Sequence, residues 1–263
     1  MSDRIRLGII GASPNVGWAY RSHLPAIAAS PEFELTGVCT TRMETAEESK
    51  RIYGARMAFD DYHTMLAHPE IDAVAVVLRV PTHYQITKDA LNAGKHVYTE
   101  WPLGKTTEEA IELAALAKEK GVRVIVGLQA RAAPAILHMK QLVEDGYVGE
   151  ILSCSMRLIR GGVLERVSGR TWQRDVELGA NTLTIAAGHS IDALRFVAGE
   201  FGEVSALVST QVDQWYETDT REMRDVTSPD NILVHGRLAN GAVVSVHVAV
   251  TVSYTHLTLP TKA

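Results

Sequence analysis

The chain has 263 residues, of which 46% are hydrophobic and 22% are charged, and its formal net charge is −5 at pH 7. This length suits one large domain or two ordinary ones, and the composition is that of a soluble globular protein. A nucleic-acid surface needs a dense field of Lys and Arg side chains, which the net negative charge disfavours. The sequence shows no signal peptide and no apolar stretch that could span a bilayer. We therefore expect a cytoplasmic protein that binds neither nucleic acid directly nor membranes.

Strand and helix patterns alternate through the first half of the chain. Short apolar runs predict strands, and periodic stretches that end at a glycine, such as Gly94 or Gly121, predict helices. The predicted strands are 5–10, 33–39, 57–59 (at a sheet edge), 71–78, 96–99 and 122–126, and the predicted helices are 18–29, 43–53, 82–93 and 106–120. This order predicts an α/β Rossmann domain, a doubly wound parallel sheet with right-handed crossovers.

The pattern changes after Arg131. The sequence then predicts helices at 134–145 and about 189–197, and strands at 151–159, 204–211, 232–238 and 242–251, with Asn240-Gly241 as a tight hairpin turn. Strands that follow one another without helices predict an α+β domain with an open, mostly antiparallel sheet. We therefore expect a dinucleotide-binding domain at 1–127 and a substrate and oligomerisation domain at 128–251, truncated at its C-terminus.

The last residues are interpreted separately. Val252-Ser-Tyr-Thr-His-Leu-Thr-Leu-Pro-Thr261 is similar to the translated read-through of a transposase mosaic-end sequencing adapter. We expect 252–263 to be a non-native, adapter-derived tail, and the alternative is a natural Thr-rich strand.

The two cysteines, Cys39 and Cys154, lie in apolar runs that resemble strands. We expect both to be buried and reduced. This pattern predicts neither a disulfide nor a metal site.

The turn between the first strand and the first helix contains glycines suited to a dinucleotide. Glycines let the backbone turn sharply and approach a pyrophosphate, and a helix N-terminus supplies partial positive charge. In Gly8-Ile-Ile-Gly11-Ala-Ser-Pro-Asn-Val-Gly17, Gly11 and Gly17 fit the first and last glycine roles, whereas Ser13 replaces the middle glycine. The loop is longer than G-x-G-x-x-G, so by itself it is equally compatible with a plain strand–helix turn. At the head of a βαβαβ unit it favours a dinucleotide site.

The end of the second strand bears on the choice of cofactor. It reads Val38-Cys-Thr-Thr-Arg42, with no Asp or Glu for a ribose 2′-hydroxyl. Hydroxyl groups and Arg42 suit a 2′-phosphate, so NADP is slightly favoured over NAD, with Thr40 and Arg42 as contacts. The alternative is that Arg42 only caps a solvent-exposed loop.

Several motifs together indicate a family. Ala90-Leu-Asn-Ala-Gly-Lys-His-Val-Tyr-Thr-Glu-Trp-Pro-Leu-Gly104 resembles the A-L-x-A-G-K-H-V-x-x-E-K-P motif of the Gfo/Idh/MocA oxidoreductase family, and Gly188-His-Ser-Ile-Asp192 resembles its H-x-x-D motif. Gly17-Trp18, 22–27 and 128–131 are similar to one branch, which contains the galactose-regulon repressor of yeasts and its bacterial relatives. The resemblance implies a Rossmann domain, an open antiparallel sheet, a sugar-like substrate bound between them, and a homodimer through the second-domain sheet.

The resemblance also implies site residues. The expected cofactor contacts are Gly11, Ser13, Gly17, Trp18, Thr40, Arg42, His83 and Glu100, with Glu100 at the nicotinamide ribose. The expected substrate contacts are Trp101, Arg131 and Trp172, and Arg160 could line the same cleft. Trp101 could stack on a sugar or on nicotinamide, or it could fill space between the domains. His23 and His63 are expected at the surface or in helix packing.

Two family residues are replaced in this chain. Trp101 stands where the family has the Lys of E-K-P, and Ile185 stands where it has an Asp four residues before the His. Neither side chain can exchange a proton, and general acid–base assistance is worth roughly 10²–10⁴ in rate. His189 remains as the candidate proton acceptor. Asp192, one turn later, could orient His189 or form a helix-end ion pair.

Two functions are therefore compatible with the sequence. One is an NAD(P)-dependent oxidoreductase that moves a hydride between a sugar or cyclitol and the nicotinamide. The other is a catalytically silent NAD(P)-binding sensor that acts through a protein partner. The cofactor domain and His189 favour the first, and the replacements at Trp101 and Ile185 favour the second.

Overall fold

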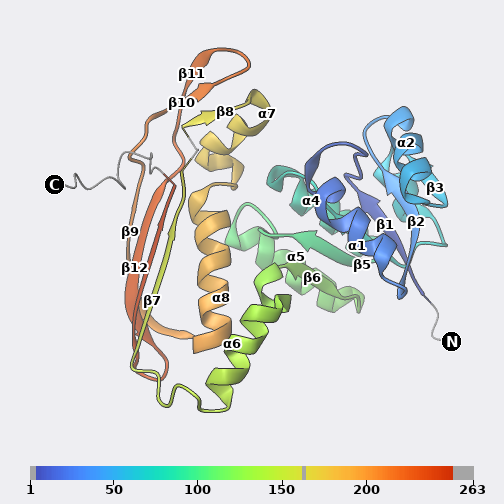
Figure 1. The fold of residues 1–263 in the computed structure, drawn as a ribbon. Helices are drawn as coiled ribbons and strands as arrows, with labels where there is room; N and C mark the ends of the chain where they lie inside the picture. Colours follow the sequence, from blue (N-terminus) through green and yellow to red (C-terminus); the bar gives the residue numbers. More distant parts are fainter. Residues whose placement is uncertain (1–3, 162–163, 251–263) are drawn as a thin grey trace, which may run out of the picture. The chain divides into compact units, whose positions relative to one another are not determined.

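The structure, a computed structural model, describes residues 4–161 and 164–250. The chain divides into two compact units, Met1–Gly127 and the residues from Leu128 onward, and each is described by itself (Figure 1). The interpretation of 252–263 as a non-native tail lies outside the described residues.

The first unit contains the predicted Rossmann sheet. Six strands lie in the order β3-β2-β1-β4-β5-β6, and every neighbouring pair is parallel. The strands are β1 (Ile5–Ile10), β2 (Phe33–Cys39), β3 (Met57–Phe59), β4 (Ala73–Val76), β5 (His96–Glu100) and β6 (Val124–Gly127). The helices between them are η1 (Ala19–His23), α1 (Leu24–Ala29), α2 (Met43–Tyr53), α3 (Tyr62–Ala67), η2 (Val80–Thr82), α4 (His83–Asn92) and α5 (Thr107–Lys120). The predicted parallel sheet is confirmed, with β3 at its edge.

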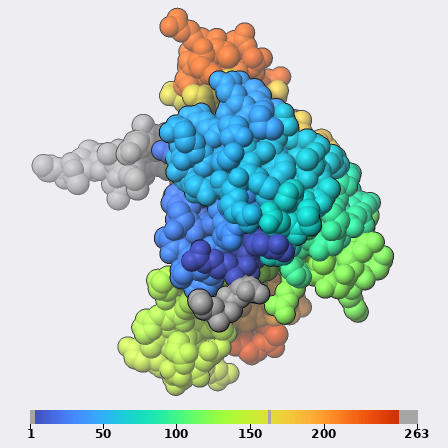
Figure 2. Space-filling view, turned by 90° about the vertical axis from the view of Figure 1, so that its right-hand side faces the viewer, coloured from blue at the N-terminus to red at the C-terminus, as the bar shows by residue number. Residues whose placement is uncertain are grey.

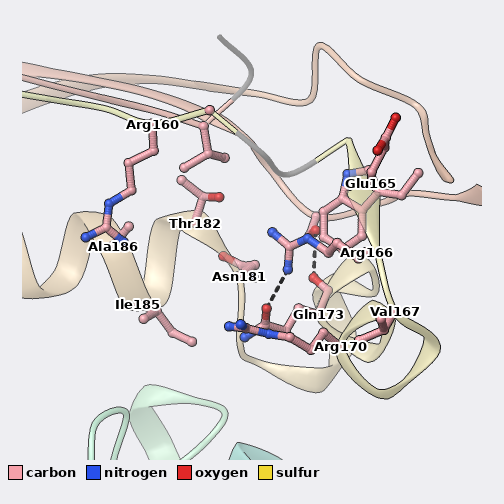
Figure 3. A pocket seen from close by; sticks show the side chains of 14 residues that line it. Arg160, Glu165, Arg166, Val167, Arg170, Gln173, Asn181, Thr182, Ile185 and Ala186 are labelled. Carbon is pink, nitrogen blue, oxygen red and sulfur yellow. Dashed lines mark hydrogen bonds between the residues drawn. The ribbon is translucent and has the colours of Figure 1, made fainter. Parts of the chain in front are cut away.

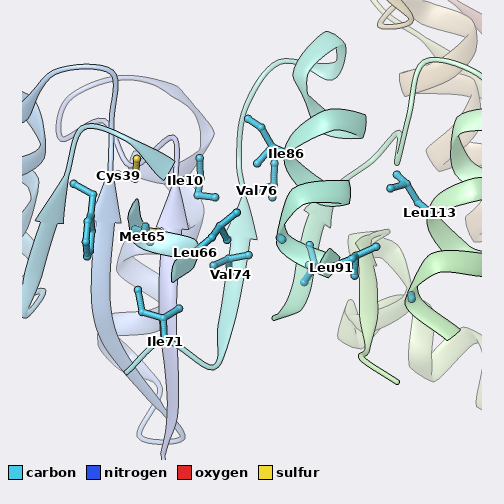
Figure 4. Close-up of a cluster of buried hydrophobic side chains, with 14 residues drawn as sticks. Ile10, Cys39, Met65, Leu66, Ile71, Val74, Val76, Ile86, Leu91 and Leu113 are labelled. Atoms are coloured by element: carbon cyan, nitrogen blue, oxygen red, sulfur yellow. The ribbon is translucent and has the colours of Figure 1, made fainter. Parts of the chain in front are cut away.

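The central strands β1 and β4 are buried on both faces, because their alternate residues enter different clusters. In the edge strand β6, by contrast, Ile125 is 60% exposed. Ile10 and Val76 belong to one cluster, which also contains Leu91 and Leu113 (Figure 4). Ile9, the neighbour of Ile10 in β1, belongs to a second cluster on the other side. In the space-filling view, residues of this unit form a continuous surface coloured blue to teal (Figure 2).

Two helices in this unit differ from the prediction. The stretch predicted as one helix over 18–29 begins as a π-helical turn, η1, before α1. Pro25 has no N–H with which to continue a regular ladder, so the helix starts irregularly. The helix α3 was not predicted; Asp61 caps it by accepting hydrogen bonds from the amides of His63 and Thr64 at 3.0 and 3.2 Å.

The second unit contains the predicted open sheet. Its strands are β7 (Ser153–Ile159), β9 (Phe201–Ser209), β12 (Asn231–Leu238) and β13 (Val243–Ala249), in the order β7-β13-β12-β9. Two of the three pairings are antiparallel, and β7 is parallel to β13. The predicted hairpin turn is confirmed, with Gly241 at φ +91° between β12 and β13. The helix α8 (Gly188–Ala198) runs alongside the sheet (Figure 1) and packs with its apolar side chains.

Smaller elements of this unit were not predicted. A second sheet, in the order β11-β10-β8, consists of β8 (Glu165–Arg166), β10 (Gln214–Glu217) and β11 (Glu222–Asp225).

The predicted helix at 134–145 is α6 (Pro134–Glu144). The short turns α7 (Ser168–Thr171), η3 (Gln129–Ala132), η4 (Trp172–Arg174), η5 (Val176–Leu178) and the π-helical η6 (Thr182–Ala187) complete the unit.

Both cysteines are free. Cys39 is buried as expected, whereas Cys154 is only half-buried. Burial is also the main cause that raises the pKa of the Cys39 thiol to about 12.

Candidate cofactor and substrate sites

The predicted phosphate-binding turn follows β1. Gly11 has φ +95°, and a Cβ there would lie 2.3 Å from the carbonyl oxygen of Val77, so only glycine fits. The amides of Gly11 and Ala12 donate to the carbonyl oxygen of Cys39 at 2.9 and 3.1 Å, which ties the turn to the end of β2. Gly17 has φ +91°, and a Cβ there would meet nothing within 4 Å. The backbone at Gly17 is therefore unobstructed, and the expected pyrophosphate contact there stays a prediction.

The loop after β2 is ordered by Thr40. Its hydroxyl donates to the carbonyl oxygen of Arg42 at 2.8 Å and lies 2.6 Å from the hydroxyl of Thr45. Arg42 is the N-cap residue of α2 and is exposed. Thr40 thus shapes the loop, and Arg42 offers a charged side chain at the strand end where a dinucleotide ribose binds in this fold.

His83 is a buried residue at the start of α4. His83 is 1% exposed, and its Nδ1 lies 2.7 Å from the carbonyl oxygen of Pro102. Nε2 lies 3.1 Å from the carbonyl oxygen of Leu78. Both ring nitrogens face backbone carbonyl oxygens, so His83 joins the loop after β4 to the loop after β5. The expected contact of His83 with a cofactor stays a prediction.

A cluster of three polar side chains lies at the end of β5. Nε2 of His23 lies 2.5 Å from Oε1 of Glu100, and both side chains are largely buried. The His23 ring packs edge-on against Tyr98 with centroids 5.3 Å apart. Burial, followed by the charge of Glu100 and a hydrogen bond to it, raises the pKa of Tyr98 to about 12. His23 is therefore not a surface residue, and it fixes the carboxylate expected at the nicotinamide ribose.

Asp192, expected one turn after His189, forms an ion pair with Arg131 in the second unit. Arg131 donates to both carboxylate oxygens of Asp192 through Nε and Nη2, at 2.6 to 3.1 Å. The Asp192 side chain is 9% exposed, and the Arg131 guanidinium also lies 5.4 Å from the Phe196 ring centroid. Of the two roles expected for Asp192, the structure shows the ion pair, and the same ion pair engages the guanidinium of Arg131.

His189 lines a cavity of about 270 Å³ together with Arg160, Ile185 and Ala186. The π-helical turn η6 and the first turn of α8 place Ile185 and His189 four residues apart on one side. Ile185 contributes an apolar wall in place of a carboxylate.

A second cavity, of about 420 Å³, shares Arg160, Ile185 and Ala186 with the first. Figure 3 shows Arg160 on one side, Arg166 and Arg170 on the other, and Asn181 and Thr182 between them. Asn181 is held because its Oδ1 accepts hydrogen bonds from the amides of Leu183 and Thr184 at 3.0 and 3.2 Å. Arg160 was expected from the sequence, whereas the other polar residues of this cavity were not.

The remaining expected contacts are tryptophans. Trp18 is 48% exposed beside the phosphate-binding turn, and Trp101 is half-buried in the loop after β5. Trp172 is half-buried in η4, and it is not among the described residues that line the two cavities around Arg160.

No group of three or more His, Cys, Asp or Glu side chains in residues 4–161 and 164–250 could hold a metal ion. No helix in the same residues has the length and apolar character needed to cross a bilayer.

Comparison with known sequences places two family profiles on the chain. Residues 5–128 match the Gfo/Idh/MocA profile, described as an oxidoreductase family with an NAD-binding Rossmann fold. Residues 134–260 match the C-terminal domain of Gal80p.

Individual relatives include enzymes and a regulator. The dehydrogenase AclE of Aspergillus oryzae is 32% identical over 90% of this chain and 68% of its own length. A super-repressor mutant of Gal80p from Saccharomyces cerevisiae superposes with a TM-score of 0.89 at 26% identity, over 95% of this chain and 69% of that chain. Levoglucosan dehydrogenase in complex with NADH and levoglucosan superposes with a TM-score of 0.85 at 27% identity, over 96% and 68%. The galactose and lactose regulatory proteins of two yeasts are covered over 59% and 57% of their lengths, so this chain spans little more than half of them.

Proposed function

Because this chain belongs to the Gfo/Idh/MocA oxidoreductase family, we propose that it is an NAD(P)-dependent oxidoreductase acting on a sugar or cyclitol. The position of His189 carries the proposal: it lines a cavity beside a larger, polar one in the second unit. The relatives include levoglucosan dehydrogenase, whose complex contains NADH and a sugar derivative.

Each group of residues has a separate role in this proposal. The turn of Gly11 and Gly17 binds the pyrophosphate, and Glu100, fixed by His23, positions the nicotinamide ribose. Bound nicotinamide would supply the hydride-accepting ring. His189 takes the proton of the hydroxyl group whose carbon is oxidised, because a neutral imidazole accepts a proton near neutral pH.

The test is the absorbance of reduced nicotinamide during turnover. The purified chain is mixed with NAD⁺ or NADP⁺ and a panel of sugars and cyclitols. We expect turnover on at least one substrate and a loss of roughly 10²–10⁴ in kcat for His189→Ala. His138→Ala is a control, since that histidine is not among the residues lining the His189 cavity. Full activity of His189→Ala would contradict its role.

A second candidate function rests on the two replacements. Trp101 and Ile185 leave no proton-transferring side chain at either position, which favours an NAD(P)-binding sensor that controls a protein partner. Gal80p, a transcriptional regulator by its name, is among the similar proteins. Tight cofactor binding without turnover on any substrate would favour this function over the enzyme.

The choice between the two cofactors rests on Arg42. We propose that its exposed guanidinium favours the 2′-phosphate of NADP. Titration with both reduced cofactors, in the chain and in Arg42→Gln, tests this. Weaker NADPH binding with unchanged NADH binding in the variant is the expected result, and tighter NADH binding by the unchanged chain would contradict it.

We also propose a homodimer through the four-stranded sheet. Val204 and Leu207 of β9 are 62% and 63% exposed, which leaves apolar side chains for a partner to cover. Light scattering after size exclusion tests this, and a monomer at all concentrations would contradict it.

A further inference from the structure

Three arginines reach the larger cavity of the second unit from three different elements. Arg160 follows the end of β7, Arg166 lies in β8, and Arg170 lies in α7. Glu165 is the one acidic residue among the described residues lining this cavity. The lining therefore has an excess of positive charge, although the chain as a whole is negative.

The guanidinium groups of the three arginines differ in their contact partners. Within the described part of the chain, neither Arg160 nor Arg170 forms an ion pair with a carboxylate. The Arg166 guanidinium lies 4.0 Å from the Trp215 ring centroid and donates to Oε1 of Gln173 at 2.6 Å. Burial, and then the charge of Arg170, lower the pKa of Arg166 to about 10. An anion in this cavity would offset that unfavourable concentration of like charges.

The rest of the lining suits hydroxyl groups. Asn181 uses its Oδ1 to cap η6, so its amide NH₂ is the end it can offer to a ligand. Thr182 adds a hydroxyl group, whereas the Ser228 hydroxyl already donates to the carbonyl oxygen of Gln173 at 2.9 Å. A volume of about 420 Å³ lies within the range of small-molecule sites. The cavity therefore combines hydroxyl-binding groups with cations at its two sides (Figure 3).

We infer that this cavity binds a sugar that carries an anionic group, a carboxylate or a phosphate, through Arg160, Arg166 and Arg170. Guanidinium groups bind both anions in a two-pronged geometry. The inference rests on the proposed function in that it narrows its substrate class to acidic sugars, but binding can be measured without turnover.

The experiment is calorimetric titration of the whole chain with three probes. Glucuronate carries a carboxylate, glucose 6-phosphate carries a phosphate, and glucuronamide is the neutral counterpart of glucuronate. We expect at least one acid to bind about tenfold or more tightly than glucuronamide, and the better acid identifies the anion. Arg160→Gln and Arg170→Gln should each weaken that binding about tenfold, because each removes a charge-assisted hydrogen bond. Arg157→Gln is the matched control, since Arg157 is an exposed β7 residue that does not line the cavity.

The inference would be overturned if neither glucuronate nor glucose 6-phosphate bound more tightly than glucuronamide, or if Arg157→Gln weakened binding as much as the other two variants do. The proposed function fails separately. Acid binding without any turnover would leave this inference standing and count against the oxidoreductase. Turnover of neutral sugars without acid binding would do the reverse.

Discussion

The two units organise polar residues in opposite ways. In the first unit, the central strands of the sheet are buried on both faces, and the residues expected at the cofactor, Gly11, Arg42 and Glu100, lie where the strands end. In the second unit, one sheet face is packed by α8, and the polar groups gather in a cavity built from short, irregular segments. A parallel sheet fixes the place of its site by topology, whereas the second unit fixes its site by individual side-chain contacts. The stability of the second unit should therefore depend more on individual ion pairs than the stability of the first unit does.

The largest expected effect is at the ion pair of Arg131 and Asp192. Arg131→Met leaves the buried Asp192 carboxylate without its partner, whereas Asp192→Asn leaves the 45% exposed Arg131 able to meet water. We expect Arg131→Met to lower the free energy of unfolding by roughly 3 kcal/mol. Asp192→Asn should lower it by less. Urea unfolding of both variants measures the difference, and equal losses would show that burial of Asp192 does not matter.

The matching test in the first unit compares two glycines. Gly11 and Gly17 have similar positive φ angles, but only at Gly11 would a Cβ collide with backbone. We expect Gly11→Ala to be less stable than Gly17→Ala by about 2 kcal/mol, because the conformational cost is shared and the collision is not. Thermal unfolding of the two variants checks this. Similar stabilities would mean that the turn does not pack against the end of β4.

At alkaline pH, titratable groups of the two units should change the stability in opposite directions. Burial raises the pKa values of Cys39, Tyr62 and Tyr98 in the first unit, each to about 12. Because the folded pKa values exceed the unfolded ones, the stability these groups contribute is present below the unfolded values and is lost as pH rises toward 12. The lowered pKa of Arg166 has the opposite sign, so stability from that group increases above about pH 10.

Thermal melts of the chain and of Tyr98→Phe between pH 9 and pH 11 measure this effect. The variant should lose less stability over this interval than the unchanged chain. Tyr147→Phe, at a residue that is 78% exposed in the second unit, should behave like the unchanged chain. Identical pH profiles for all three proteins would contradict the expected contribution of Tyr98.

The smallest expected effect concerns buried hydroxyl groups. Thr87 of α4 is fully buried, and its hydroxyl has no hydrogen-bond partner among the described residues. Thr171 of the second unit donates to Glu217 instead. We expect Thr87→Val to stabilise by about 0.5 kcal/mol and Thr171→Val to destabilise by about 1 kcal/mol. Denaturant midpoints test the signs, and a loss of stability in Thr87→Val would reveal a hydrogen bond to bound water.

The first unit was predictable because its strands carry strong local signals. Apolar runs such as β1 and β2, and the αL glycines Gly54 and Gly121 after α2 and α5, indicate the elements directly. The helix α3 was missed even though Asp61 is an ordinary N-cap signal, because it is only six residues long.

The second unit was predictable only in its long strands and in α8. The strand β8 has two residues, and β10 and β11 are joined through Arg221, which adopts φ +61° where a glycine would have signalled a turn. The sequence around Arg166 and Arg170 therefore did not predict that they line a cavity. No local pattern predicted the contact of Arg131 with Asp192, 61 residues away. Similarly, only the folded sheet brings His23 to Glu100.

The most direct test of the central claim is the transfer of deuterium from a deuterated sugar to the oxidised cofactor, followed by mass spectrometry of the nicotinamide product. The substrate is one that the absorbance assay identifies, with deuterium at the carbon that carries the oxidised hydroxyl. We predict that the reduced cofactor gains this deuterium, and that His189→Ala slows its appearance without changing its destination. Reduced cofactor without deuterium, or no reduced cofactor with any substrate, would contradict an oxidoreductase that transfers hydride directly.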